Sequence, residues 1–305
     1  LSSEGIRVNQ TLCDIRGPTR EELLGMSPAD LAPPGERRHA IDFNERLLRD
    51  GSASYAREKQ YVRKDGQIIW ASVSLAAVRG PDGQPGYMYD VGIKPEMNRM
   101  ITSSWAHPGH IKAGDSPAHS GKDVVVWDYK AKKVLQVQET DLAPLEVRWL
   151  HGPQATSGYT NAAFGNAIWY WEDANKDGTL EFSRVVALPE NSAPADMRIT
   201  YDNRFLFVSM WGGSKVVQYD IADPKSPKVV SEVVIPQPNM MRISADNKRL
   251  YVTNSLLSSF DGDKVRFGAW IIDIGPQGMK INEKFQPDFA SFPTGPAGAH
   301  DMLFR

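Results

Sequence analysis

The sequence predicts a mainly β fold, a partial β-propeller of about four blades preceded by a smaller α+β domain. Residues 197–208 recur, with substitutions, as residues 241–252, a spacing of 44 residues that is typical of propeller blades. Each copy has the pattern of a short strand, an Asp-Asn turn and an apolar strand. A third strand follows and ends at Asp220 or Asp273. Because one such unit cannot bury both of its faces alone, neighbouring units must stack.

Two earlier segments end their third strand in the same way, at Asp128 after Val-Trp and at Glu172 after Tyr-Trp. The four acidic ends are 44, 48 and 53 residues apart. Residues 93–103 have the strand–turn–strand form of a blade, and residues 299–303 open a fifth repeat. We therefore assign residues 87–305 to the propeller.

The first 86 residues are organised differently and form the predicted α+β domain. A short helix is expected at residues 21–25, and a longer one at residues 36–49 carries an apolar face. Strands are expected at residues 54–64 and 67–79, joined by the turn Asp65-Gly66, because Asp-Gly accepts the positive φ angles of a hairpin.

This domain resembles a PAS sensor domain that lacks most of its first strand. The matching pieces are Arg7–Gln10, Thr19–Gly25, Gly51, Tyr61–Gly66, Trp70 and the turn at Val78–Pro85. Residues 86–92 fit the last strand of such a sheet. The single cysteine, Cys13, does not lie in the Asn-Cys-Arg motif of the flavin-binding branch. His39 is expected to face solvent beside Arg37 and Arg38 and not to bind haem.

Composition excludes several classes of protein. The formal net charge is −2, which gives no basic field for nucleic acid. No apolar run approaches the ~20 residues of a membrane-spanning helix. One cysteine permits neither an internal disulfide nor a cysteine zinc site. The chain begins without Met or a signal-peptide pattern, so we expect a truncated or processed N-terminus, and both the cytoplasm and the periplasm stay open.

The propeller part resembles the selenium-binding protein family, whose bacterial members include methanethiol oxidases. The resemblance rests on Lys94–Trp105, Ala143–His151, Gln218–Pro224, Lys248–Leu256 and Gly295–Met302. It covers the C-terminal half of the family. It implies copper-dependent oxidation of a small thiol, methanethiol, to formaldehyde, hydrogen sulfide and hydrogen peroxide.

Copper chemistry of this kind favours imidazole ligands, and five of the six histidines follow residue 100. His300 falls in the family's Ala-His-acidic-Met motif before an innermost strand and is either a metal ligand or a structural residue. His151 ends the matched strand 147–150 and is either a ligand or a turn residue bonded to backbone. His107 and His110 are weaker candidates because Pro108 and Gly109 make their segment a loop.

Residues 173–180 mimic the start of an EF-hand calcium loop. The twelfth position, which should be a bidentate Glu, is Arg184, and no helix pattern flanks the segment. We interpret it as a hairpin turn between Trp171 and Phe182.

Three functional hypotheses remain. The first is a methanethiol oxidase-like enzyme with an incomplete site, since the family's N-terminal blades and their cysteine motif are replaced by the PAS-like part. The second is a sensory or interaction protein with a propeller docking surface. The third is a non-native fusion of two gene fragments, whose open sheet edges would favour self-association.

Overall fold

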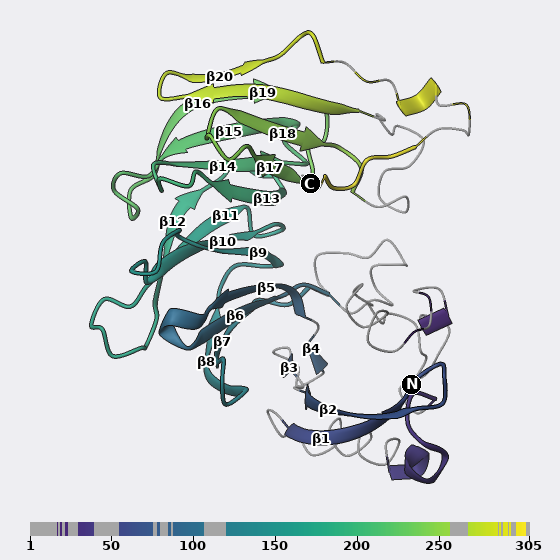
Figure 1. Cartoon of the computed structure of the whole chain (residues 1–305). Helices are drawn as coiled ribbons and strands as arrows, with labels where there is room; N and C mark the ends of the chain where they lie inside the picture. The colour runs from purple at the N-terminus through teal and green to yellow at the C-terminus, as the bar shows by residue number, and fades with distance from the viewer. Residues whose placement is uncertain are drawn as a thin grey trace. The chain divides into compact units, whose positions relative to one another are not determined.

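The computed structural model describes residues 17, 19, 22–23, 30–39, 55–75, 78–79, 85–86, 88–106, 120–256, 268–285, 287, 289–291, 293 and 297–302. The chain divides into two compact units (Figure 1). Unit 1 comprises residues 1–79 and 131–134, and unit 2 comprises residues 80–130 and 135–305. The predicted boundary after residue 86 stays a prediction. Within the described residues no helix combines the length and the apolar character needed to span a membrane.

Unit 1 contains a hairpin of the predicted kind. Its elements are the 3₁₀ turn η1 (Pro34–Glu36) and the strands β1 (Tyr55–Val62), β2 (Ile68–Leu75) and β3 (Val78–Arg79). β1 pairs antiparallel with β2. The turn between them is the predicted Asp65-Gly66, with Gly66 at a φ of 81° and the Gln67 N–H donating to the Asp65 carboxylate.

Two further local features of unit 1 agree with the sequence patterns. Thr19 and Glu22 form a reciprocal capping box at the start of the first helical turn, where each side chain accepts from the other residue's backbone N–H. His39 is exposed, as predicted. Cys13, Gly51 and most of the helix predicted at 36–49 lie outside the described residues.

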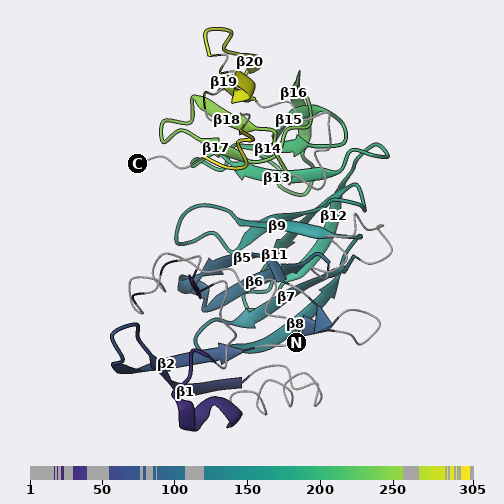
Figure 2. The same ribbon diagram turned by 90° about the vertical axis from the view of Figure 1, so that its right-hand side faces the viewer.

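Unit 2 consists mainly of four four-stranded antiparallel sheets, each formed by consecutive strands. Figures 1 and 2 show these blades following one another in chain order. Their strands are β5 (Met88–Lys94), β6 (Arg99–Ser104), β7 (Asp123–Asp128) and β8 (Lys133–Glu139); β9 (Pro144–Trp149), β10 (Ser157–Ala162), β11 (Ala167–Glu172) and β12 (Glu181–Ala187); β13 (Pro194–Ile199), β14 (Phe205–Met210), β15 (Lys215–Asp220) and β16 (Lys228–Val234); and β17 (Met241–Ile243), β18 (Arg249–Thr253), β19 (Ala269–Gly275) and β20 (Gly278–Ile281). Unit 2 also contains β4 (Pro85–Gly86), η2 (Pro95–Met97) and η5 (Phe289–Ser291).

The four blades confirm the predicted repeat. Asp128, Glu172 and Asp220 end the third strands of their blades, and the fourth of these strands runs two residues beyond Asp273. The two Asp-Asn turns are alike: Asn203 and Asn247 both have a φ of 58°. Asparagine tolerates this left-handed conformation better than most residues, which explains its recurrence at one turn position.

The first blade resolves an ambiguity in the sequence. Residues 86–92 fit the last strand of a PAS sheet, but β5 pairs with β6 and forms the inner strand of the first blade. η2 supplies the turn between the two strands, and Asn98 closes it at a φ of 54°.

Apolar side chains from adjacent blades pack together. The second strand of the third blade, β14, is buried on both faces because it lies between two neighbours. Its Leu206 and Val208 join the cluster against the second blade, whereas Phe205 and Phe207 join the cluster against the fourth. This alternation follows from the two-residue period of a strand. Each such side chain contributes roughly 1.5–3 kcal/mol when fully buried.

The segment that mimics a calcium loop forms the predicted hairpin turn. Trp171 and Phe182 are paired across β11 and β12. Both carboxylate oxygens of Asp173 accept the backbone N–H of Gly178, at 3.2 and 3.1 Å. Arg184, at the twelfth position, forms an ion pair with Asp141 at 2.9 Å. The Asp173 carboxylate therefore stabilises the turn by accepting one of its backbone N–H groups.

Candidate metal centre and the inner-strand network

Acidic and arginine side chains recur along the inner strands, the first strand of each blade. Asp90, Glu146 and Asp196 occupy corresponding positions on β5, β9 and β13, and Asp301 matches them in the fifth repeat. An arginine follows two residues later in the second, third and fourth blades, namely Arg148, Arg198 and Arg242. The blade repeat thus places a row of alternating acidic and arginine side chains across these strands. We call these seven residues the inner-strand belt.

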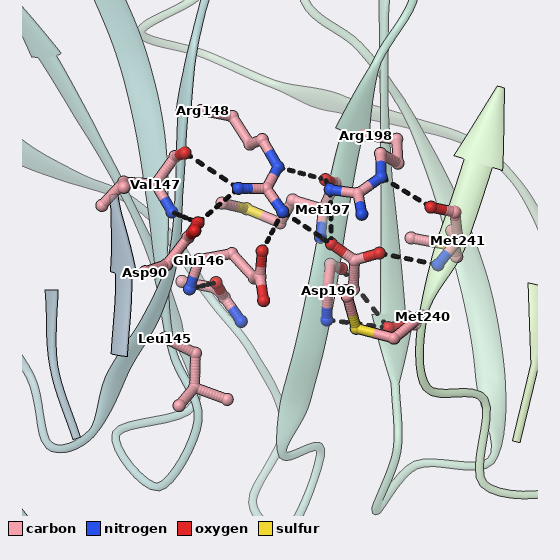
Figure 3. A network of polar contacts seen from close by, with 12 residues as sticks. Asp90, Leu145, Glu146, Val147, Arg148, Asp196, Met197, Arg198, Met240 and Met241 are labelled. Carbon is pink, nitrogen blue, oxygen red and sulfur yellow. Dashed lines mark hydrogen bonds and ion pairs between the residues drawn. The ribbon is translucent and has the colours of Figure 1, made fainter. Parts of the chain in front are cut away.

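Arg148 joins three blades (Figure 3). Its guanidinium donates to the carboxylates of Asp90 and Glu146, and its Nη2 lies 3.3 Å from Asp196 Oδ1. Its Nε donates to the Met197 carbonyl at 3.2 Å. The side chain is only 22 % exposed, so these acceptors replace the water that the charge has lost.

Asp196 is the most buried member of the belt. Its carboxylate receives the backbone N–H groups of Met197 and Met241, both at 2.7 Å, and the Arg198 Nη1 at 2.8 Å. Burial raises the pKa of Asp196, and Arg198 and Arg148 act against that rise. Burial likewise lowers the pKa of Arg148, and Asp90 and Asp196 oppose that change. The Asp196 carboxylate and the Arg148 guanidinium therefore each favour the charged form of the other.

The fourth blade departs from the pattern. Met240 stands where the other blades have an acid, so Arg198 has no carboxylate at that position of the fourth blade, although its Nε donates to the Met241 carbonyl at 2.6 Å as that of Arg148 does to the Met197 carbonyl. Arg242 reaches forward to Asp301 at 2.6 Å, as Arg148 reaches Asp196. The Asp301 carboxylate accepts the Met302 N–H, just as Asp196 accepts that of Met197. Residues 300–302 therefore occupy the place of a fifth inner strand.

Hydroxyl groups on the second strands of the first, third and fourth blades each donate to a carbonyl at the start of the next inner strand. Ser209 Oγ donates to the Asn239 carbonyl at 2.7 Å, and Thr253 Oγ1 donates to the His300 carbonyl at 2.8 Å. Ser103 makes the same contact with the Leu145 carbonyl. Asn239 and His300 are consequently equivalent residues on adjacent inner strands.

His300 is held in an orientation suited to a metal ligand. Its Nδ1 lies 2.9 Å from the Ser255 carbonyl and 3.1 Å from Asn239 Nδ2. Nδ1 thus faces an acceptor, the Ser255 carbonyl, and a donor, the Asn239 amide, so its own role depends on the tautomer of the ring. In the tautomer with the proton on Nδ1, the Nε2 of the exposed ring carries a lone pair, the form in which imidazole binds metals.

His151 lies at the other end of the inner strands. Its Nε2 lies 3.0 Å from the Ile199 carbonyl at the end of β13, and its backbone exchanges two hydrogen bonds with Asn203. Its ring also contacts Tyr201 at 4.9 Å between centroids. These contacts join the second blade to the third.

The inner strands run side by side in one direction, as the contacts of β13 with Met241 and of Tyr201 with Asn247 show. His300 lies beside their N-terminal ends and His151 beside their C-terminal ends. The six residues of β13 span roughly 16 Å at ~3.3 Å per residue. Since a ligand nitrogen lies ~2 Å from its metal, one ion cannot bind both histidines.

The remaining candidates, His107 and His110, lie outside the described residues. Across the described part of the chain, no three His, Cys, Asp or Glu side chains are grouped closely enough to hold a metal ion. Among the described residues at the N-terminal ends of the inner strands, His300 is thus a single candidate ligand without further ligands grouped around it.

Two residues near His300 were not predicted, namely Asn239 and Ser255. Their link to His300 depends on the alignment of inner strands, because Asn239 and His300 are 61 residues apart. The repeat carries the signal: when Met241 and Met302 are both aligned with Met197, Asn239 and His300 fall at one position.

Comparison with known proteins now places the chain in a family. The family model described as 56-kDa selenium-binding protein (SBP56) matches residues 76–305. The chain belongs to the 56-kDa selenium-binding protein family. A PAS-fold family model matches residues 5–91, which agrees with the resemblance of the N-terminal part.

Curated relatives include methanethiol oxidases. The mouse methanethiol oxidase is 30% identical over 302 residues, which covers 78% of this chain and 64% of the relative. Mouse selenium-binding protein 2 is 29% identical, covering 73% of this chain and 60% of the relative. The chain therefore spans about six tenths of the length of these relatives.

Solved structures show the same fold. A hypothetical selenium-binding protein from Sulfolobus tokodaii superposes with a TM-score of 0.64 at 24% identity, covering 81% of this chain and 66% of that one. The periplasmic gluconolactonase of Pseudomonas aeruginosa reaches a TM-score of 0.52 at 15% identity, covering 75% of this chain and 62% of that one. At these identities the likeness concerns the fold alone.

Proposed function

We propose that this chain takes part in copper-dependent oxidation of methanethiol, with His300 as a copper ligand. The observation that carries the proposal is the exposed ring of His300, whose Nδ1 is held 2.9 Å from the Ser255 carbonyl; with the proton on Nδ1, Nε2 is available to a metal. Relatives named methanethiol oxidase supply the substrate class.

The donor type fits copper. A neutral imidazole nitrogen suits both oxidation states of the metal, and copper bound there would supply one-electron chemistry with dioxygen. His300 would hold the metal, and the backbone that carries it is anchored by Thr253 and by the Arg242–Asp301 ion pair. Further ligands must come from outside the described residues or from another chain, because among the described residues no three His, Cys, Asp or Glu side chains are grouped closely enough to hold a metal ion.

We propose His107 and His110 as sources of further ligands. They follow β6 in the sequence, and the last residue of β6, Ser104, pairs with the first residue of β5, Met88. His151 is not part of this proposal because it lies at the opposite end of the inner strands.

The reaction consumes one methanethiol, one dioxygen and one water and yields one formaldehyde, one hydrogen sulfide and one hydrogen peroxide. The carbon–sulfur bond breaks, the carbon gains oxygen from water, and two electrons pass to dioxygen. The site must therefore admit a small apolar thiol and water together.

The test is turnover by the full chain loaded with copper. Formaldehyde, sulfide and peroxide are measured in the same sample, in wild type, His300→Ala and the matched exposed-histidine control His39→Ala. We expect products in equal amounts from wild type and the control, and loss of at least ten-fold in His300→Ala. No product from copper-loaded wild type, or equal turnover in all three, would refute the proposal.

A further inference from the structure

The outer strand of the first blade, β8, presents an apolar edge. β8 is the last strand of its sheet, and its hydrogen-bonded neighbour among the described strands is β7 (Figure 1). Burial alternates along β8, so that every second side chain is exposed. The exposed ones are Lys133, Leu135, Val137 and Glu139, and the leucine and the valine are 50 % and 58 % exposed. The backbone N–H and C=O groups on the edge that faces away from β7 can pair with another strand.

The opposite face of β8 is bonded to the second blade. Gln136 Nε2 donates to the Leu180 carbonyl at 2.8 Å, and the Leu180 N–H donates to Gln136 Oε1 at 3.3 Å. These two bonds fix the middle of the strand, so its exposed face has a defined orientation.

The outer strands of the other blades have features that protect an edge. β12 and β16 both shift register against the strand next to them, and such bulges bend a strand and interrupt further pairing. The exposed side chains of β12 include the charged residues Glu181 and Arg184. β20 is short, with four residues. β8 instead combines seven residues with two half-exposed apolar side chains.

The exposed face of β8 is complementary to itself. A basic residue, Lys133, lies at one end and an acidic residue, Glu139, at the other, with the two apolar residues between them. When two such strands run antiparallel and are centred on Gln136, Leu135 of one is opposite Val137 of the other, and each lysine is opposite a glutamate. A parallel pair in register would set like charges opposite each other, which is destabilising. The charge pattern therefore favours a second copy of the chain in antiparallel orientation.

We propose that β8 is the interface of a two-fold dimer of this chain, formed by antiparallel pairing with β8 of a second copy. The pairing joins the four-stranded sheets of the two first blades into one continuous sheet. Because it uses the edge of each β8 that faces away from β7, the assembly closes at two chains. Lys122 contacts Glu139 at 3.4 Å within one chain, but both side chains are exposed, so this weak pair leaves Glu139 available.

Sedimentation equilibrium of the full chain measures the dissociation constant of the dimer. We expect wild type to reach twice the chain mass of 33.9 kDa. Lys133→Glu sets glutamates opposite each other at both ends of the interface and should raise the constant by about ten-fold or more. Glu139→Lys should do the same with lysines. The double variant restores opposite charges and should return the constant to within ~3-fold of wild type.

Lys228→Glu is the matched control, because it makes the same charge change at an exposed position on the outer strand of the third blade. It should leave the dissociation constant unchanged, and urea unfolding confirms that each variant is folded. A wild type that stays monomeric up to ~1 mM overturns the inference. A dimer that neither single exchange weakens also overturns it, since that dimer uses another face. So does a double variant that remains as weak as the single ones.

Discussion

The exchange Asp196→Asn probes the inner-strand belt most sharply, because it removes one charge and hardly any volume. The Asp196 carboxylate accepts two backbone N–H groups and contacts two guanidinium groups. An asparagine keeps one acceptor oxygen. Its amide nitrogen must then face either the Met197 or the Met241 N–H, so one buried donor loses its partner and the two arginines lose a counter-charge.

The expected cost is large. Breaking a buried ion pair by removing one partner typically costs ~3–5 kcal/mol, since it leaves an uncompensated buried charge. A domain with a total stability of roughly 5–15 kcal/mol would lose a large fraction of it. The matched control is Asp220→Asn, since Asp220 pairs with Arg204 at a more exposed site and also serves one backbone N–H. Its cost should stay below ~1 kcal/mol.

Urea unfolding, followed by tryptophan fluorescence, measures both variants. Seven of the eight tryptophans lie in the propeller part, so the signal reports unit 2. We expect a lower midpoint for Asp196→Asn with an unchanged slope. A loss below ~1 kcal/mol, equal to that of Asp220→Asn, would show that the belt does not hold the blades together.

Three further predictions concern packing and pH. Gly158→Ala should destabilise the chain by ~1–3 kcal/mol or more, because its Cβ would lie 2.3 Å from the Arg148 carbonyl oxygen and 2.5 Å from Trp171. Gly275→Ala is the control, since a Cβ there would have nothing within 4 Å, and it should be nearly neutral in the same urea assay. Leu206→Ala in the core between the second and third blades should cost ~2–5 kcal/mol, and the half-exposed Leu135→Ala much less; equal thermal unfolding midpoints would contradict this packing. Burial raises the pKa of Tyr219 to about 12, so the neutral phenol is favoured in the folded state and stability should be lost as pH rises from ~10 to ~12. Tyr219→Phe should lose less stability over that range, and an identical alkaline profile for the two proteins would argue against a buried phenol.

The strands of the propeller were predictable because their signals are local. Alternating apolar residues and Asp-Asn turns recur at one spacing, and Asn203 and Asn247 adopt the same backbone angle. The hairpin at Asp65-Gly66 and the turn at residues 173–180 were predictable for the same reason. In each case a few neighbouring residues determine the conformation.

Features that depend on distant residues were not predictable. Residues 88–94 alternate in a way that suits either a PAS sheet or a blade, and only their pairing with β6 decides between them. Arg148 contacts Asp196, 48 residues away, and Asn239 meets His300 across the gap between inner strands. These contacts depend on how the inner strands of adjacent blades are aligned with each other. The sequence of a single segment does not determine that alignment.

Metal content of the purified full chain tests the central claim most directly. The chain is saturated with copper, freed of excess metal and measured by mass spectrometry, alongside His300→Ala and His151→Ala. The account predicts near-stoichiometric copper in wild type and in His151→Ala, and its loss in His300→Ala. Copper that is absent from wild type, or retained equally without His300, would contradict it.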